Sequence, residues 1–274
     1  MGLDATRSAE APIGVFDSGV GGLSVLQHIR HLMPAEKLLY CADSLHAPYG
    51  AKTSEQIQAR AFVLTDFLIR QGAKAIVVAC NTATAAAVQS LRERYSLPIV
   101  GMEPAVKPAV ASTRTGVVGV LATVGTLKSA QFAALLENYG KGIEVVTQAC
   151  HGLVECVERG ELRDEGTQAL VRRYVEPLVA RKADTIVLGC THYPFVRSLI
   201  ECEVGAGVTL IDTGSAVARQ VQRRLSELGL LRQSGGGEHF WTSGDTAQAD
   251  RVFSRLWGAP VQVAHLDEKK VEQD

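Results

Sequence analysis

The segments GAKAIVVACNTAT (residues 72–84) and KADTIVLGCTHYP (residues 182–194) match each other, and this match decides the fold. Each begins with the aliphatic, β-branched run typical of a buried parallel strand and ends at a cysteine followed by polar residues. The cysteines, Cys80 and Cys190, are separated by 190 − 80 = 110 residues. A second pair repeats the relation, because IGVFDS ends at Ser18 and VGVLAT at Thr123, 123 − 18 = 105 residues later. Repetition over half a domain predicts two similar lobes.

Other strand-like runs complete the two series: KLLYCA (37–42), PIVGM (98–102), IEVVTQ (143–148) and VTLID (208–212). Segments with helical periodicity, such as SEQIQARAFVLTDFLIRQG (54–72), separate the runs. This alternation predicts an α/β fold of two similar lobes, each a mainly parallel sheet flanked by helices, related by a pseudo-two-fold axis. Ligands bind beyond the carboxyl ends of parallel strands, so we expect Cys80 and Cys190 to face each other across one cleft.

Composition narrows the classes of function. The chain has 274 residues, 46% hydrophobic and 21% charged, with a formal net charge of −1, which does not favour a nucleic-acid partner. The start, MGLDATRSAEAP, lacks the apolar core of a signal peptide, and no apolar run suffices to span a bilayer. We therefore expect a cytoplasmic protein without membrane attachment. Its six cysteines would stay reduced there, and neither cysteine nor histidine spacing indicates a metal site.

The polar residues after each cysteine suggest an active site. A lone buried cysteine is usually a small core residue, but two matched Cys-polar-polar contexts favour chemistry. Inverting a tetrahedral carbon by proton transfer requires an acid and a base on opposite faces, and the reverse reaction exchanges their roles. Two thiols, Cys80 and Cys190, meet this requirement, and His192 is a candidate to tune or relay the proton of Cys190. We predict racemisation of a small amino acid.

Two glycine-containing segments lie at other strand ends. In DSGVGG (17–22), backbone N–H groups are placed to bind an anion, and Asp17 is a candidate to act on Cys80 or a substrate ammonium, or to cap the helix. The segment has no Walker lysine and does not match G-x-G-x-x-G, so nucleotide binding is the weaker alternative. In PYG (48–50), Tyr49 is a candidate donor and Gly50 allows close backbone approach, although a simple turn explains both.

Taken in order, IGVFDSGVGGLSVL, PYG, ACNTATAAA, GVLATVGT, GCTHYP and FWTSGD resemble the glutamate racemases of the cofactor-independent aspartate/glutamate racemase group, over about residues 13–266. The resemblance implies interconversion of L- and D-glutamate without cofactor or metal, feeding peptidoglycan synthesis in a bacterial cytoplasm. It implies that Cys80 acts on D-glutamate and Cys190 on L-glutamate, assisted by Asp17 and His192. The implied substrate-binding residues are Asp17, Ser18, Tyr49, Gly50, Asn81, Thr82, Thr123, Thr191 and His192, with Glu158 of VERG a looser match.

The same resemblance implies a discontinuous first lobe, residues 1–104 plus 213–274, and a second lobe of residues 105–212. Some members of the group need a peptidoglycan precursor as activator, and their oligomeric state varies, so a homodimer is compatible with the sequence. Two segments depart from the group: DSLH (43–46) replaces the usual D-T-A-R, and CHGLVEC (150–156) replaces a more apolar, proline-bearing stretch.

Two alternatives remain open at this point. The first is an aspartate racemase of the same group, because one methylene separates the substrates and is worth only about 1 to 3 kcal/mol. The second is a non-catalytic regulator that keeps the cleft to bind an amino acid. Binding alone does not require two thiols, and DSGVGG with CTHYP favours glutamate.

Overall fold

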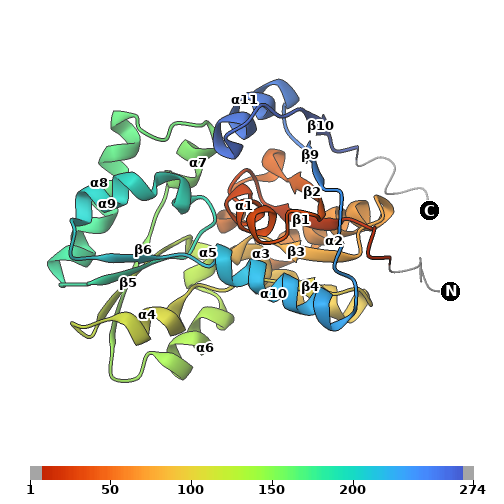
Figure 1. Cartoon of the computed structure of the whole chain (residues 1–274). Helices are drawn as coiled ribbons and strands as arrows, with labels where there is room; N and C mark the ends of the chain where they lie inside the picture. Colours follow the sequence, from red (N-terminus) through yellow and green to blue (C-terminus); the bar gives the residue numbers. More distant parts are fainter. Residues whose placement is uncertain (1–7, 268–274) are drawn as a thin grey trace.

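Parallel strands form two separate sheets in residues 8–267, the part of the chain that the computed structural model describes (Figure 1). The strands are β1 (Ile13–Asp17), β2 (Lys37–Ala42), β3 (Ala75–Val78), β4 (Ile99–Val100), β5 (Val117–Ala122), β6 (Glu144–Ala149), β7 (Thr185–Leu188), β8 (Thr209–Ile211), β9 (Gly237–Thr242) and β10 (Val263–His265). The larger sheet has the order β10-β9-β2-β1-β3-β4, and the smaller has the order β6-β5-β7-β8.

The two sheets repeat one topology. The order β2-β1-β3-β4 in the larger sheet corresponds strand by strand to β6-β5-β7-β8 in the smaller. Within this correspondence, β3 leads to Cys80 and β7 leads to Cys190, whereas β1 leads to Ser18 and β5 to Thr123. The predicted two-lobed α/β fold is therefore confirmed. Strands β9 and β10 extend the larger sheet beyond β2, so that the end of the chain lies beside its beginning (Figure 1).

Helices cover both faces of each sheet. Those packed on the larger sheet, which together with it form lobe one, are α1 (Leu23–Leu32), α2 (Ser54–Arg70), α3 (Asn81–Arg94), α10 (Gly214–Glu227) and α11 (Thr246–Trp257), with the 3-10 turns η1 (Ser44–His46) and η2 (Tyr49–Ala51). Lobe two, around the smaller sheet, contains α4 (Val106–Ser112), α5 (Val124–Leu127), α6 (Ala130–Tyr139), α7 (Leu153–Glu158), α8 (Glu165–Ala180), α9 (Arg197–Val204) and the 3-10 turn η3 (Tyr193–Val196).

The sequence explains why these elements form. Every residue of β1, β3 and β7 is buried, as expected for aliphatic strands covered by helices on both faces. Helix α2 begins with a capping box, in which Thr53 accepts a hydrogen bond from the N–H of Gln56 and the Gln56 side chain accepts one from the N–H of Thr53. One apolar cluster lies between α2, α3 and the larger sheet, and a second lies between α4, α6 and the smaller sheet.

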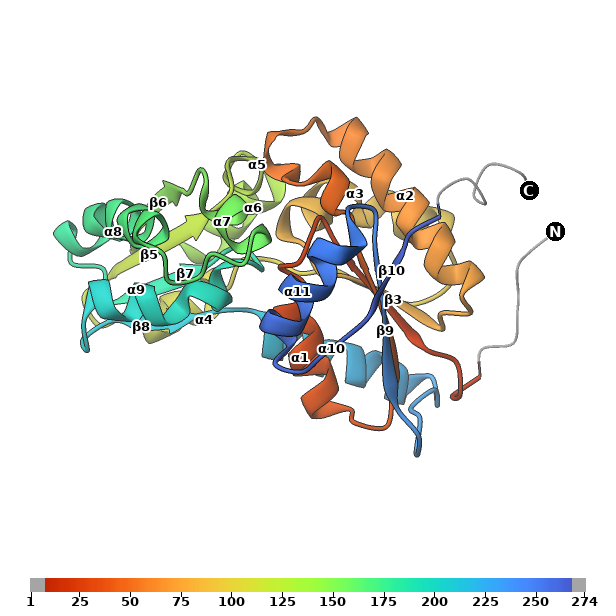
Figure 2. The same ribbon diagram turned by 90° about the horizontal axis from the view of Figure 1, so that it is seen from above.

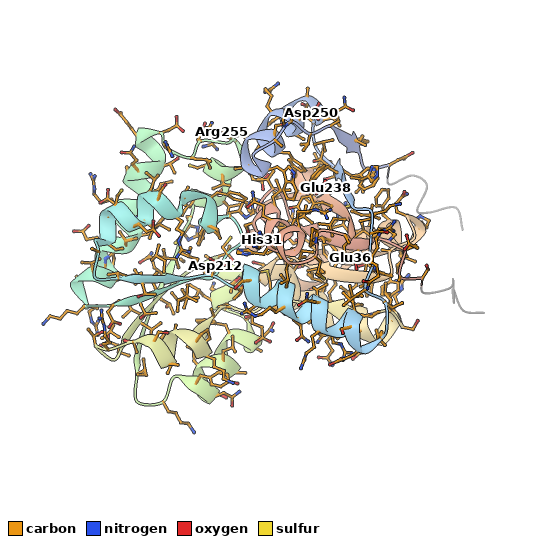
Figure 3. All side chains as sticks on the ribbon, viewed as in Figure 1. His31, Glu36, Asp212, Glu238, Asp250 and Arg255 are labelled. Atoms are coloured by element: carbon orange, nitrogen blue, oxygen red, sulfur yellow. The ribbon has the colours of Figure 1, made fainter. Side chains whose placement is uncertain are left out.

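The two lobes lie side by side and meet where β1, β3, β5 and β7 end (Figure 2). A third apolar cluster contains residues of both lobes. The chain passes between the lobes twice, after β4 and before α10. Asp212 lies at the second crossing (Figure 3). It accepts hydrogen bonds from the N–H of Gly214 and from Arg197, and His28 of α1 lies 3.9 Å away. Among residues 8–267, none of the helices has the length and apolar character needed to cross a bilayer.

Candidate active site

Cys80 and Cys190 line the same small cavity between the lobes. Cys80 is the N-cap of α3, and its sulfur accepts a hydrogen bond from the N–H of Ala83 at 3.4 Å. Its thiol donates toward the hydroxyl of Ser18 at 3.8 Å. Burial, reinforced by the charge of Asp17, raises the pKa of Cys80 well above its usual value. Cys80 is therefore a thiol in this cavity.

Most of the predicted substrate-binding residues surround this cavity. Its lining comprises Ser18, Pro48, Tyr49, Gly50, Cys80, Asn81, Thr82, Thr123, Val154, Gly189, Cys190, Thr191 and His192. Asp17 and Glu158 are not in this lining but bond to residues that are. The side-chain amide of Asn81 is buried, and neither its oxygen nor its nitrogen has a partner among the described residues. A buried amide without partners is costly, so Asn81 is prepared to bind a polar ligand in the cavity.

A chain of contacts runs from Cys190 through His192 to Glu158. His192 Nδ1 lies 3.6 Å from Cys190 Sγ, and His192 Nε2 lies 2.6 Å from Glu158 Oε1. Burial alone lowers the pKa of His192, but the hydrogen bonds to Cys190 and Glu158 outweigh it and hold the pKa well above its usual value. The imidazolium donates from both ring nitrogens, toward a carboxylate on one side and a sulfur on the other. Cys190 thus faces a cationic group across 3.6 Å.

Asp17 is buried at the other side of the site. Its carboxylate accepts hydrogen bonds from the N–H groups of Ser18 and Gly22, each at 2.6 Å, and from the hydroxyl of Thr191 at 3.1 Å. Burial raises the pKa of Asp17, although His192 partly counteracts this. Because Thr191 belongs to lobe two, Asp17 also joins the lobes.

The glycines of DSGVGG have a role that the sequence did not reveal. A Cβ on Gly19 would lie 1.8 Å from Glu158 Oε1, and one on Gly21 would lie 2.2 Å from His192 Nδ1. Glu158 approaches so closely because its carboxylate accepts the N–H of Val20 at 2.7 Å. The loop does bind anions, as its position predicts, but those anions are the protein's own carboxylates, Asp17 and Glu158.

Tyr49 lines the cavity, but its hydroxyl points elsewhere. It donates to Asp43 Oδ2 at 2.6 Å. Asp43 also accepts from Arg60, from Ser243 of the β9–α11 connection and, at 2.9 Å, faces His46 Nδ1. Burial raises the pKa of Asp43, but the hydrogen bonds and charge of Arg60 more than offset it, and the net pKa is lowered. Asp43 thus anchors the loop that presents Tyr49 to the cavity.

Sequence reasoning did not assign Asp43 a role in the site, nor did it find Thr126. The hydroxyl of Thr126 lies 3.1 Å from that of Thr82 and 3.0 Å from that of Thr123. Two signals were present in the sequence. Asp43 directly follows the strand-like run KLLYCA, and Thr126 stands three residues after Thr123, the spacing of a helix N-cap and its N3 residue.

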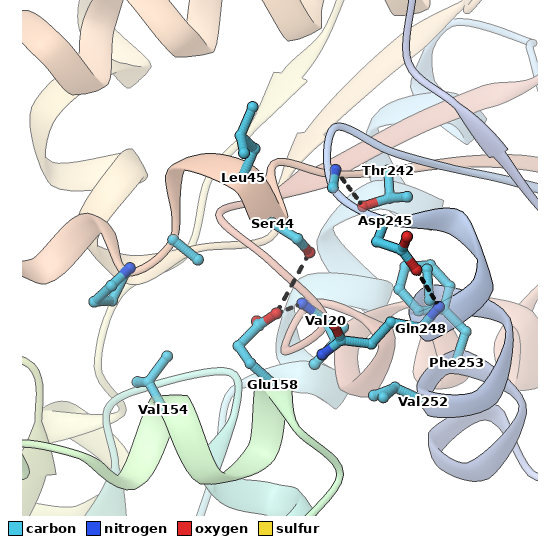
Figure 4. A pocket seen from close by; sticks show the side chains of 14 residues that line it. Val20, Ser44, Leu45, Val154, Glu158, Thr242, Asp245, Gln248, Val252 and Phe253 are labelled. Atoms are coloured by element: carbon cyan, nitrogen blue, oxygen red, sulfur yellow. Dashed lines mark hydrogen bonds between the residues drawn. The ribbon is translucent and has the colours of Figure 1, made fainter.

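A larger hollow of about 330 Å³ opens beside the cavity (Figure 4). It lies between η1, α7 and α11, and apolar side chains that include Leu45, Val154 and Phe253 form much of its wall. Glu158 borders it, and the hydroxyl of Ser44 lies 3.4 Å from Glu158 Oε2 (Figure 4). The departing segment DSLH therefore faces this hollow, next to the Glu158–His192 pair.

The six cysteines, which all lie within the described residues, are free thiols. Over residues 8–267 there is no group of three or more histidine, cysteine or acidic side chains that could hold a metal ion. The hydroxyls and the amide that line the cavity suit the carboxylates of an amino acid, and the carboxylate of Asp17 lies directly behind the lining residues Ser18 and Thr191.

Comparison with known proteins agrees with this geometry. Residues 13–221 match the family model described as Asp/Glu/hydantoin racemase. The glutamate racemase of Ectopseudomonas mendocina is 58% identical over 259 residues, covering 94% of this chain and 98% of that protein. The chain therefore belongs to the Asp/Glu/hydantoin racemase family, and the resemblance inferred from the motifs is confirmed.

Solved structures give the same result. The glutamate racemase isoform RacE1 of Bacillus anthracis superposes with a TM-score of 0.86 at 34% identity, covering 94% of this chain and 98% of that one. The Escherichia coli glutamate racemase in complex with L-glutamate and the activator UDP-MurNAc-ala superposes with a TM-score of 0.81 at 30% identity, with coverage of 93% and 97%.

Proposed function

We propose that this protein interconverts L- and D-glutamate by a two-base mechanism in which Cys80 and Cys190 act from opposite sides of the substrate. The observation that carries the proposal is that these two thiols, at the ends of equivalent strands of the two lobes, line one cavity. The products of such an enzyme include D-glutamate, which is used in peptidoglycan synthesis.

The two cysteines have different surroundings. Cys190 faces the His192 imidazolium, which Glu158 holds, whereas the raised pKa of Cys80 keeps it a thiol. Proton removal and return on opposite faces require one base and one acid. In the direction from L to D, Cys190 removes the Cα proton and Cys80 supplies one to the other face. The reverse reaction exchanges the roles.

The remaining residues bind and orient the amino acid. The partnerless amide of Asn81 and the hydroxyls of Ser18, Thr82, Thr123 and Thr191 are donors for its carboxylates. Tyr49 and Gly50 contribute the wall and backbone of the loop after β2. Asp17, which lies next to Cys80 and Thr191, contributes negative charge near the substrate ammonium. His192 and Glu158 act on the proton of Cys190.

Glutamate enters only when the lobes separate. The cavity between them has a volume of about 10 Å³, close to the least that holds one water molecule. We propose that the lobes comprise residues 1–104 plus 213–274 and residues 105–212, and that they move about the two crossings. Asp212, at the second crossing, bonds to groups from both sides of it.

Regulation, assembly and location follow from the relatives. The E. coli structure contains the activator UDP-MurNAc-ala, and we propose that a peptidoglycan precursor also activates this enzyme, which works in the cytoplasm as a homodimer. Two measurements test this: the rate with and without UDP-MurNAc-L-alanine, and the mass in solution. Equal rates, or a monomer at assay concentration, would remove the corresponding proposal.

The main experiment uses purified protein without added cofactor. L-glutamate is incubated in deuterated water while optical rotation and the Cα proton signal are followed, with Cys80→Ser, Cys190→Ser and L-aspartate as comparisons. We expect inversion with deuterium incorporation for glutamate, lost in both variants. Inversion of aspartate alone would change the substrate but not the chemistry. Absence of exchange with either amino acid, even with UDP-MurNAc-L-alanine present, would support a binding protein.

A further inference from the structure

Three threonine hydroxyls form a closed ring where the two lobes touch. Thr82 lies 2.9 Å from Thr123 and 3.1 Å from Thr126, and the latter two lie 3.0 Å apart. Thr82 belongs to the first turn of α3 in lobe one, whereas Thr123 caps α5 and Thr126 lies within it in lobe two. Thr82 and Thr123 line the cavity with the cysteines, but Thr126 does not and is only 1% exposed.

The proton inventory of the ring gives Thr126 a distinct position. Each hydroxyl donates one hydrogen bond and accepts up to two. In this ring, each of the three hydroxyl protons forms a hydrogen bond to the oxygen of another threonine. The N–H of Thr126 also donates to Thr123 Oγ1 at 3.2 Å. In the ring, the Thr123 hydroxyl donates to Thr126 Oγ1. When the Thr82 and Thr123 protons turn toward the cavity instead, the O–H of Thr126 can still donate to Thr82 Oγ1 and its N–H to Thr123 Oγ1, so both oxygens stay held from behind.

We propose that Thr126 is a positioning residue that orients the hydroxyls of Thr82 and Thr123 as paired donors to a carboxylate of the substrate. This inference rests on the proposed amino-acid substrate. Since the ring joins the two lobes, the pair of donors is assembled only when the lobes close. Closure and carboxylate binding are thereby coupled through a residue that does not touch the substrate.

The surrounding backbone is shaped for this contact. A Cβ on Gly125 would lie 3.0 Å from Thr82 Cγ2 and 3.3 Å from the carbonyl oxygen of Gly50. A Cβ on Gly50 would in turn lie 3.0 Å from the Cβ of Thr123. Side chains at these two glycines would therefore crowd the approach of α5 to α3 and to the loop after β2, and with it the ring.

The test removes one hydroxyl. Thr126→Val keeps the shape of the side chain and the N–H, whereas Thr126→Ser keeps the hydroxyl. We expect Thr126→Val to raise KM for both enantiomers of glutamate about tenfold, the effect of losing one hydrogen bond from a misoriented Thr82 or Thr123 hydroxyl to the substrate carboxylate, with kcat changed less than threefold. Thr126→Ser should restore KM to within about twofold. Thr126→Ala provides a second hydroxyl-free variant if the valine protein folds poorly.

Thr65→Val is the matched control, because Thr65 is fully buried in α2 and its hydroxyl has no partner among the described residues. It should leave KM unchanged. Wild-type KM in both hydroxyl-free variants, or an equal rise in Thr126→Ser, would overturn the positioning role while leaving the racemase intact. Failure of the wild-type protein to racemise glutamate would instead overturn the proposed function itself.

Discussion

Glu158 and His192 of lobe two form a 2.6 Å ion pair, and His192 is only 2% exposed. The pair sets the charge of the imidazole that faces Cys190. Glu158→Gln removes that charge, so the pKa of His192 should fall. The His192 imidazolium persists until the pH rises through its pKa. If that pKa is lower in the Glu158→Gln variant, the imidazolium loses its proton at a lower pH.

The expected result for Glu158→Gln is an alkaline limb of the pH–kcat/KM profile shifted downward by about one pH unit. Because the enantiomers have equal free energy in water, kcat/KM must fall by the same factor in both directions. Glu155→Gln, on the same helix, is the control and should leave the profile unchanged. An identical alkaline limb in the Glu158→Gln enzyme would contradict the role of the ion pair.

Gly19→Ala tests the close approach of the loop to Glu158. The added methyl group would occupy the place of the carboxylate and push it away from the N–H of Val20 and from His192. We expect kcat/KM to fall about 100-fold, as for a misplacement of about 1 Å in an active site. In the Gly19→Ala enzyme, the further change Glu158→Gln should lower kcat/KM only slightly, because both changes disrupt the same contacts of the Glu158 carboxylate.

The control is Gly166→Ala, because a Cβ there meets nothing within 4 Å and the residue lies inside α8. Alanine should stabilise this helix by up to about 1 kcal/mol and leave kinetics unchanged. Equal activity of Gly19→Ala and wild type would show that the lobes do not close as described.

Tyr49→Phe separates two roles of the tyrosine. Its hydroxyl donates to Asp43 and not into the cavity, so we expect kcat/KM to stay within about threefold of wild type. The free energy of unfolding should fall by about 1 kcal/mol, since Asp43 keeps Arg60 as a partner. Urea titration with steady-state kinetics measures both. A loss of kcat/KM of more than tenfold at unchanged stability would instead indicate a hydroxyl that binds substrate.

Lys74→Met tests a buried ion pair far from the cysteines. Lys74 Nζ lies 2.6 Å from Glu36 Oε2 and also donates to the carbonyl oxygens of Ala9 and Leu230. Removing the cation leaves Glu36 buried without its charge partner, which should cost about 3 to 5 kcal/mol of stability. The additional change Glu36→Gln should recover part of it. The kcat of the folded enzyme should not change, because Lys74 lies at the end of β3 opposite Cys80.

The internal repeat made the larger part of the fold and both cysteines predictable. Equivalent strands of the two sheets lead to Cys80, Cys190, Ser18 and Thr123. The carboxyl ends of these strands meet where the two lobes face each other. The predicted lining residues that follow these strands therefore lie around one cavity. Their individual roles remain predictions until the variants are measured.

Contacts between the lobes could not be predicted in this way. The partner of Glu158 on lobe one is a backbone N–H of Val20, and a backbone group leaves no mark in the sequence. The hydroxyl of Thr126 bonds to that of Thr82 on the other lobe. Asp43 accepts hydrogen bonds from side chains in segments that are far apart along the chain. The position of β9 beside β2 likewise depends on a free sheet edge that only the assembled sheet defines.

The strand order of the larger sheet bears on how the protein is made. All strands of the smaller sheet lie between Val117 and Ile211, so they can pair while the chain is still attached to the ribosome. The larger sheet begins with β1, which precedes every strand of the smaller sheet, but receives β9 and β10 after all of them. Until residue 242 at the end of β9 emerges, the edge of β2 is exposed to other nascent chains. Lobe one, whose first strand is synthesised before lobe two, is thus completed only after lobe two.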